Sequence, residues 1–236
     1  MIARCPHFSH FSRIKHAFFE EDREPLEARK SRVMRTLAGE EIPLVVLNQV
    51  HGNTVISITD PWDEEIKPRQ ERQMGDALVT HVPGIALGVE TADCGPVLFY
   101  DPEAHVIGVA HAGWKGARAG ILQATIAAME TLGARRATLH ATLGPTIQHQ
   151  DYEVGPEFPD LIGEPYTSYF YPAVKPTHHH FNLPQYIHDI LQNEGITHRH
   201  DLKINSFTSG FSSRRRTLSP GAEGEYFSGL SALVLL

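Results

Sequence analysis

The sequence predicts an α+β protein in which a mixed β-sheet is covered by helices on its outside. Short apolar runs outnumber stretches with helical periodicity, and several runs follow one another too closely for helical crossovers. The 236 residues are 41% hydrophobic and 21% charged, which is ordinary for a chain that buries a full core. These observations exclude a disordered or fibrous chain and favour a mixed sheet over a doubly wound Rossmann fold.

Three segments have the apolar spacing of amphipathic helices. The first, residues 25–37, carries four apolar residues on one face. The second contains Leu122, Ile126 and Met129, which recur at helical spacing. The third, residues 184–193, has proline in its first turn. A glycine follows each segment and is expected to end the helix.

Strands are predicted where aliphatic or alternating runs are bounded by turn residues. Residues 60–73 are polar and bear prolines, so they are predicted to be a surface excursion. Residues 152–184 are rich in proline and aromatics and are expected to be loop with short helices. The expected strands comprise residues 44–47, 54–59, 77–80, 85–89, 97–100, 106–110, 137–143, 202–206 and 229–236.

Charge and length limit the classes of partner and compartment. The formal charge of −7 argues against a broad basic face, so we expect no nucleic-acid or anionic-membrane partner. No stretch approaches the roughly 20 apolar residues of a membrane span, and the N-terminus lacks the apolar core of a signal peptide. We therefore expect a cytoplasmic protein with reduced thiols. The length favours one domain, residues 1–236, and no repeat or linker divides it.

Three residues that can carry chemistry each stand at the end of a predicted strand. Cys94 lies in TADCGP, His51 in QVHG and His111 in HAGWKG. Two imidazoles and a thiolate form a three-ligand zinc set, and an open fourth position is typical of catalytic zinc. Two alternatives remain, because a single cysteine is often a buried hydrophobe, and an unmetallated Cys94 beside histidines would be an activated thiolate.

A series of motifs resembles a known family. QVHG, GDALVT, TADCGPV, HAGWKG, GPTI followed by DYEVG, and FSSRR occur in this order in the YfiH-like family, also labelled laccase-domain or multicopper polyphenol oxidase proteins. The resemblance runs from about residue 42 to the C-terminus. It implies a single catalytic domain folded as a layered mixed-sheet sandwich with outer helices. It also implies that His51, Cys94 and His111 bind Zn²⁺, with copper as the alternative ion.

The resemblance further implies an activity. Family members are described as purine nucleoside phosphorylases that cleave adenosine, inosine and methylthioadenosine with phosphate, giving the base and a pentose 1-phosphate. Some are also described as deaminating adenosine. The implied partners of this chain are therefore a purine nucleoside and phosphate, and we expect a monomer or small homo-oligomer.

Phosphorolysis requires a cationic seat for phosphate. The glycines of HAGWKG expose backbone N–H groups where a helix is expected to begin, with Lys115 and Arg118 adjacent. Arg214 and Arg215 of FSSRR can add donors for phosphate oxygens. The alternative is that these residues, together with Arg216, form a solvated surface.

Other polar residues admit two interpretations each. Asp76 and Asp93 are candidates for orienting ligand imidazoles or exchanging a proton, although Asp76 follows Gly75 and is also suited to capping a turn. Tyr152 and Glu153 either line a pocket or anchor a loop.

The remaining histidines are expected to have no ligand role. The consecutive histidines 178–180 are interpreted as solvated loop, since neighbouring side chains on an extended chain point to opposite sides. His198 and His200 share one side of an extended chain, but the nearby sequence offers no third partner.

The chain departs from the family pattern in three places. It lacks a glycine-rich, Asn-bearing segment between His16 and the first helix, a cysteine before FSSRR, and an arginine in the segment occupied by residues 227–229. The missing arginine weakens any inherited phosphate contact, whereas the metal set is intact.

Two rival classes of function remain open. One is a hydrolase that edits peptidoglycan precursors, because some bacterial relatives are described so. The other is a binding module without catalysis, which would require that the three proposed ligands do not converge. Copper-dependent phenol oxidation is disfavoured, because one His, Cys, His set cannot build a multicopper cluster.

Overall fold

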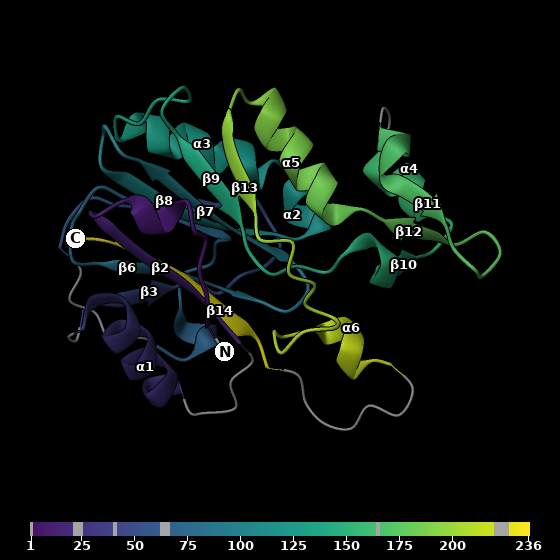
Figure 1. Ribbon diagram of the computed structural model, residues 1–236, viewed down its shortest axis with the longest axis horizontal. Coiled ribbons are helices and arrows are strands. Elements are labelled where there is room, and N and C mark those ends of the chain that lie inside the picture. The colour runs from purple at the N-terminus through teal and green to yellow at the C-terminus, as the bar shows by residue number, and fades with distance from the viewer. Residues whose placement is uncertain (1, 21–25, 40–41, 62–66, 164–165, 220–226) are drawn as a thin grey trace.

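Two large β-sheets packed face to face dominate the computed structural model (Figure 1). The structure describes residues 2–20, 26–39, 42–61, 67–163, 166–219 and 227–236. The five-stranded sheet has the order β1 (Ile2–Ala3), β2 (Ile14–Phe19), β14 (Gly229–Leu235), β6 (Ala86–Thr91), β3 (Leu44–Val46). The six-stranded sheet has the order β13 (His198–Asp201), β9 (His140–Leu143), β7 (Gly95–Asp101), β8 (Val106–Ala112), β5 (Ala77–Thr80), β4 (Val55–Ile58).

Both sheets mix parallel and antiparallel pairs. In the six-stranded sheet β13 runs parallel to β9 and β4 parallel to β5, while β7 and β8 pair antiparallel with each other. A small third sheet contains β10 (Glu153–Val154), β12 (His179–Phe181) and β11 (Phe170–Pro172). It lies in the stretch expected to be loop with short helices, so the sequence pattern missed these short strands.

The described residues form six helices, of which the three longest cover the outer faces of the two large sheets. The six are α1 (Leu26–Ala38), α2 (Trp114–Arg118), α3 (Ile121–Thr131), α4 (Phe158–Ile162), α5 (Leu183–Asn193) and α6 (Arg214–Thr217). Short 3₁₀ turns are η1 (Phe8–His10), η2 (Arg69–Glu71), η3 (His149–Asp151) and η4 (Tyr166–Tyr169). No helix among the described residues combines the length and the apolar character that crossing a bilayer requires.

Alternation along the strands separates the core into layers. On β8, Ile107 and Val109 belong to the core between the sheets, whereas Val106 and Ala110 pack in the layer of α3 and α5. Helix α1 packs on the other outer face, against β2 and β14. The predicted α+β class, a layered mixed-sheet sandwich with outer helices, is confirmed.

Close packing and capping explain two features of α3. A Cβ built on Gly108 of β8 would lie 2.9 Å from the Met129 sulfur, so glycine lets the helix approach the sheet. Gly133 has φ +102° and follows the helix, as expected of a C-cap. The first helix was expected from Pro25, a residue that lies outside the described part of the chain.

The strand predicted over residues 202–206 is wrong. The chain instead pairs with β9 over His198–Asp201, and it leaves the sheet where Lys203 adopts φ +54° and donates its N–H to Asp201. An edge strand has one open side, so its polar sequence gave no apolar alternation to detect. Leu202 and Ile204 were mistaken for strand residues because they pack against the inter-sheet core from a loop.

Candidate active site

His51, Cys94 and His111 meet at one end of the six-stranded sheet. One ligand atom of each residue lies within 4.8 Å of those of the other two, and we call this group the thiol cluster. Cys94 directly precedes β7 and His111 lies near the end of β8, two strands that pair antiparallel with Pro96 opposite His111. His51 reaches them from the turn between β3 and β4, with 4.7 Å between the two imidazole centroids.

The fully buried carboxylate of Asp76 holds two members of the cluster in place. It accepts the backbone N–H groups of Val50, His51 and Gly52 at 3.2, 2.9 and 2.8 Å, so it fixes the turn that carries His51. Its Oδ1 also lies 2.8 Å from Nδ1 of His111. A carboxylate only accepts, so His111 carries its proton on Nδ1 and its Nε2 is the atom that can ligate a metal. Both expected roles of Asp76, capping and orienting, are present together.

Neighbouring charges set the protonation of the cluster in its metal-free form. Burial disfavours the thiolate, but the charge and hydrogen bonds of His111 and His51 outweigh it and lower the pKa of Cys94. Burial also opposes charge on His111, but the Cys94 sulfur and Asp76 together raise its pKa. Hydrogen bonds from His111 and the turn outweigh burial and lower the pKa of Asp76. The cluster therefore favours a thiolate beside an imidazolium.

Backbone geometry around the cluster is unusual at three positions. His51 and Asp93 have φ of +62° and +81°, in the left-handed region that costs a non-glycine residue about 1–3 kcal/mol. A Cβ built on Gly113 would lie 2.7 Å from the Cys94 sulfur, so only glycine leaves room there. Strain and a steric gap are therefore concentrated beside the reactive atoms.

The donor set fits a transition-metal ion. Two imidazole nitrogens and a thiolate are ligands that zinc and copper prefer, and the space left by Gly113 keeps the sulfur uncovered on that side. His111 is 4% exposed, Cys94 is half-buried and His51 is exposed, so the cluster opens toward solvent on the side of His51.

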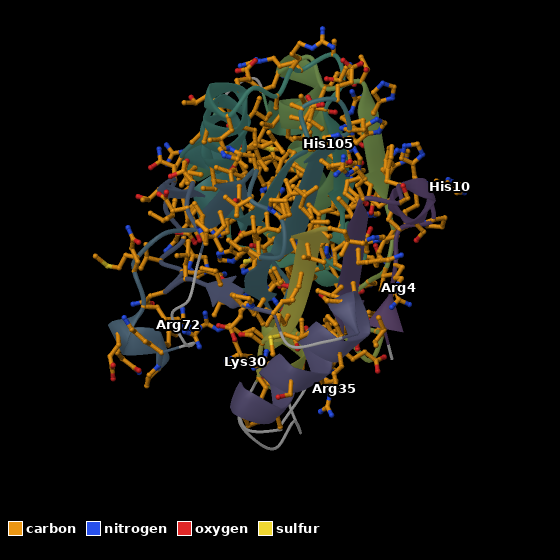
Figure 2. All side chains as sticks on the ribbon, turned by 90° about the vertical axis from the view of Figure 1, so that its left-hand side faces the viewer. Arg4, His10, Lys30, Arg35, Arg72 and His105 are labelled. Atoms are coloured by element: carbon orange, nitrogen blue, oxygen red, sulfur yellow. The ribbon has the colours of Figure 1, made fainter. Side chains whose placement is uncertain are left out.

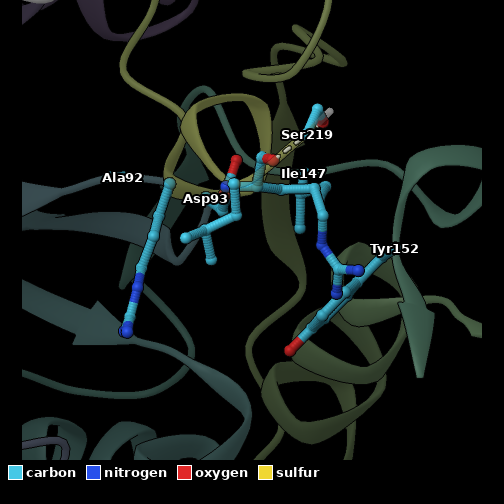
Figure 3. A pocket seen from close by; sticks show the side chains of 8 residues that line it. Ala92, Asp93, Ile147, Tyr152 and Ser219 are labelled. Atoms are coloured by element: carbon cyan, nitrogen blue, oxygen red, sulfur yellow. Dashed lines mark hydrogen bonds between the residues drawn. The ribbon is translucent and has the colours of Figure 1, made fainter. Parts of the chain in front are cut away.

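Two cavities adjoin the thiol cluster. A small cavity of about 90 Å³ has the cluster in its wall together with Gln49, Arg69, Glu90, Ala92, Arg214 and Ser228. A large cavity of about 530 Å³ is lined by Ala92, Asp93, Ile147, Tyr152, Arg214, Arg215, Leu218 and Ser219. Figure 3 shows Tyr152 across the large cavity from Ala92. Ala92 and Arg214 line both cavities, so the two spaces meet beside the cluster.

The predicted cations differ in where the structure places them. Arg214 lines both cavities, whereas Lys115 and Arg118 are exposed on α2 and line neither. The Lys115 ammonium lies 5.6 Å from the centroid of the Trp114 ring. The structure therefore brings Arg214 to the thiol cluster and leaves the two α2 cations at the surface.

The two arginines that follow Arg214 hold the segment that forms a wall of the large cavity. Arg215 lies over the Tyr152 ring at 5.6 Å and donates to the Glu153 carbonyl at 2.8 Å. Arg216 donates to four backbone carbonyls, those of Ser206, Phe207, Ser209 and Phe211. The alternative of a solvated arginine surface is therefore wrong for these two residues.

Asp93 fastens that segment beside Cys94. Its carboxylate accepts from Ser206 Oγ at 2.7 Å and from the Arg215 backbone N–H at 2.6 Å. The donors to both oxygens of Asp93 are thus residues near Arg214, so Asp93 holds the Arg214 segment in position, while Asp76 orients His111.

Arg69 and Gln49 line the small cavity, but the sequence pattern did not indicate either as a site residue. Arg69 falls in the predicted surface excursion, yet it donates to the Gln49 carbonyl at 2.9 Å and lines the small cavity. The Gln49 side chain pairs with the backbone N–H and C=O of Glu90, both at 2.7 Å. The position of Gln49 within QVHG was the one available signal, because it adjoins the turn of His51.

Comparisons with known proteins agree with the resemblance to YfiH-like proteins. The family model described as multi-copper polyphenol oxidoreductase laccase matches residues 9–229. A purine nucleoside phosphorylase of Deinococcus radiodurans is 43% identical over 137 residues, 57% of this chain and 50% of that protein. The chain thus spans about half the length of that relative. The purine nucleoside phosphorylase ORF3 of Streptomyces griseus is 37% identical over 205 residues, 83% of this chain and 78% of that protein.

Solved structures share the fold. A Neisseria meningitidis protein superposes with a TM-score of 0.76 at 26% identity, covering 100% of this chain and 98% of its own. The Bacillus licheniformis protein YfiH gives a TM-score of 0.76 at 22% identity, covering 96% of this chain and 94% of its own. At that identity the second likeness concerns the fold alone.

Proposed function

The chain belongs to the family described as multi-copper polyphenol oxidoreductase laccase, and we propose that it is a purine nucleoside phosphorylase. Several proteins similar to this chain carry that name. Its substrates are adenosine, inosine and methylthioadenosine, and its products are the free base and a pentose 1-phosphate. The observation that carries the proposal is the meeting of two cavities at Arg214, beside the thiol cluster.

The two cavities suit the two reactants. The large cavity of about 530 Å³ falls within the roughly 300–1,000 Å³ typical of small-molecule sites, and the Tyr152 ring gives it an aromatic wall for a purine. The small cavity carries the guanidinium groups of Arg69 and Arg214, which suit a phosphate. Phosphate and nucleoside can therefore lie side by side with Arg214 between them.

Phosphorolysis requires the charges on the attacking phosphate and on the departing purine to be stabilised while the C1′–N bond breaks. A phosphate oxygen bonds to C1′ of the pentose, the C1′–N bond breaks, and its electron pair leaves with the purine, which takes up a proton. Arg69 and Arg214 hold the phosphate against C1′. A zinc ion bound by the thiol cluster would supply Lewis-acid stabilisation of negative charge on an oxygen. Asp76 keeps His111 and the turn of His51 in position for that ion.

The test is the phosphate dependence of base release. Purified protein, with its metal content determined, is incubated with inosine or adenosine with and without phosphate, and base and pentose 1-phosphate are quantified. Phosphorolysis predicts that both products appear only with phosphate and in equal amounts. Base release without phosphate would mean a nucleoside hydrolase, and conversion of adenosine to inosine would mean a deaminase. Either result in the absence of pentose 1-phosphate overturns the proposal.

Copper-dependent phenol oxidation is poorly supported by the placement of the histidines. A second group of histidines, described below, lies near Tyr100 at the far end of β7 from Cys94. Six residues of strand separate these ends, about 20 Å at the rise of a β-strand. The two groups therefore cannot share one multinuclear copper centre.

A further inference from the structure

Four histidines from three separate segments of the chain gather at the edge of the six-stranded sheet. His140 begins β9, His198 and His200 lie on the neighbouring strand β13, and His7 comes from the segment before η1. We call these four residues the histidine cluster. In Figure 1 the purple N-terminal turn lies against this sheet. The sequence offered no third partner for His198 and His200, and the fold provides two.

The spacing of the nitrogens approaches that of a metal site. Nε2 of His7 lies 3.0 Å from Nδ1 of His140. One nitrogen each of His7, His140 and His200 lies within 4.8 Å of the other two. Nitrogens bound to one tetrahedral zinc at about 2.05 Å are separated by about 3.3 Å, so ligation requires the three rings to move closer and to turn until their lone pairs point at one ion.

Stacking holds the imidazole rings in this arrangement. The His7 ring stacks on that of His200 with 3.9 Å between centroids, and the His140 ring stacks on that of His198 at 4.3 Å. Phe11 meets His140 edge-on at 5.0 Å. These contacts keep the rings close together, but a nitrogen lone pair lies in its ring plane, so the His7 and His200 rings must leave this stack to point at one ion.

One nitrogen of the histidine cluster has no hydrogen-bond partner among the described residues. His140 is 9% exposed. The Nε2 atom of His200 is shielded from solvent, and it has no hydrogen-bond partner within the described part of the chain. A shielded polar atom without a partner costs about 1–3 kcal/mol, so the arrangement needs a compensating interaction that stacking does not supply.

We propose that His7, His140 and His200 form a second metal site, distinct from the thiol cluster, that takes a divalent ion favouring imidazole ligands, with zinc as the reference ion. The bound ion clamps the N-terminal segment onto strands β9 and β13. A site made only of imidazoles accepts zinc, copper or nickel and disfavours calcium and magnesium, which require oxygen ligands. The fourth position is left to water, with His198 stacked alongside.

The first experiment counts ions in a chain that lacks the other site. In Cys94→Ser protein, dialysed against micromolar zinc, the proposal predicts one bound zinc per chain. Adding His7→Phe, which keeps an aromatic ring in the stack but removes the nitrogens, is expected to weaken zinc binding at least about 100-fold. His10→Ala is the matched control, because His10 is an exposed histidine of the same segment, at the edge of the molecule in Figure 2.

Cobalt distinguishes the two sites by their spectra. Co²⁺ at the thiol cluster gives a thiolate-to-metal charge-transfer band, whereas Co²⁺ at the histidine cluster gives only visible ligand-field bands. The proposal predicts that Cys94→Ser removes the charge-transfer band and keeps ligand-field bands, and that adding His200→Gln to Cys94→Ser removes those ligand-field bands as well. The same zinc content in Cys94→Ser protein with and without His7→Phe would overturn the proposal. So would ligand-field bands that persist in the Cys94→Ser, His200→Gln protein.

Thermal unfolding covers the case in which a variant folds poorly. Zinc is expected to raise the Tm of Cys94→Ser protein and to leave that of the Cys94→Ser, His7→Phe protein unchanged. An equal rise in both proteins would overturn the proposal. These results are read from zinc content, spectra and Tm, so none of them depends on phosphorylase activity.

Discussion

The thiol cluster and the histidine cluster lie at opposite ends of β7. The pKa of a buried histidine is raised in the first cluster and lowered in the second. At the Cys94 end, a thiolate and the Asp76 carboxylate raise the pKa of His111 above its ordinary value, although burial opposes them. At the Tyr100 end, burial and the neighbouring imidazoles lower the pKa of His140 to about 4. Burial acts in the same direction in both places, so the neighbouring groups decide the outcome.

This difference in pKa gives the thiol cluster a pair of opposite charges and leaves the histidine cluster with neutral imidazoles that can bind a metal. The thiol cluster stores a pair of opposite charges next to two open cavities, where a substrate can use them. The pKa values of His7 and His200 are also lowered, first by burial, so these imidazoles are neutral at pH 7. Asp101 is the one group that acts to raise the pKa of His140 among its main determinants. Four predictions test this contrast.

The largest expected effect comes from removing the thiol. Cys94→Ala takes away the anion of the thiol cluster and one metal ligand, so phosphorolysis should fall by about three orders of magnitude. The rate of base release with saturating phosphate measures it. Cys5→Ala is the control, since Cys5 is a free buried cysteine away from the cavities and should leave the rate unchanged. A similar loss in both variants would contradict a special role for Cys94.

Asp76→Asn should separate positioning from stability. The amide cannot accept every hydrogen bond that the carboxylate does, so we expect metal affinity and kcat to fall about 10–100-fold. Asp101→Asn is the matched control. Asp101 is equally buried and accepts from three backbone N–H groups and Thr138, far from the cavities. Both variants should lose stability in urea, but only Asp76→Asn should lose metal and activity. Equal activity loss would refute the positioning role.

His16 is a buried histidine outside both clusters, and burial is the main cause of its lowered pKa. Burial, with a smaller effect of Arg4, lowers its pKa from 6.5 to about 4, and its Nε2 accepts the Cys5 N–H. The unfolded chain therefore binds a proton that the folded chain does not, and stability is lost as pH falls below 6.5. Between pH 6.5 and 5 this contributes a loss of about 1.5 kcal/mol.

Urea unfolding at the two pH values measures the His16 effect. The loss on acidification should shrink by that amount in His16→Gln and stay the same in His10→Gln, whose histidine is exposed. An unchanged loss in His16→Gln would show that His16 is not the titrating group.

The smallest expected effect distinguishes the predicted cations. Arg214→Ala should raise the KM for phosphate roughly five- to tenfold with little change in the Tm, since Arg214 lines both cavities and is exposed. Lys115→Ala should change the KM less than twofold, because Lys115 lies outside both cavities. The reverse ranking would assign the phosphate contact to Lys115 of α2 rather than to Arg214, both of which the sequence offered as candidates.

The sequence was most informative where motif and strand pattern coincide. His51, Cys94 and His111 each follow or end an apolar run. Cys94 and His111 lie at adjoining ends of the neighbouring strands β7 and β8, whereas His51 comes from the turn that links β3 of one sheet to β4 of the other. Long-range partners left no such trace. His7 reaches His140 across 133 positions, and Arg69 reaches the small cavity from a stretch with no apolar period. The choice between Lys115 and Arg214 depends on where side chains lie around a cavity, which spacing along one chain does not encode.

Asp76 also acts as a check on strand register. Its backbone C=O accepts the His111 N–H at 2.7 Å and its N–H donates to Thr54 at 2.9 Å, while its side chain closes the turn of His51. A slip of one residue between β5 and β8 would turn His111 away from the cluster and deprive the buried carboxylate of its His111 donor. Chains with the wrong register would thus lose both stability and the metal site. A chain that folds stably is therefore also a chain that can assemble the site.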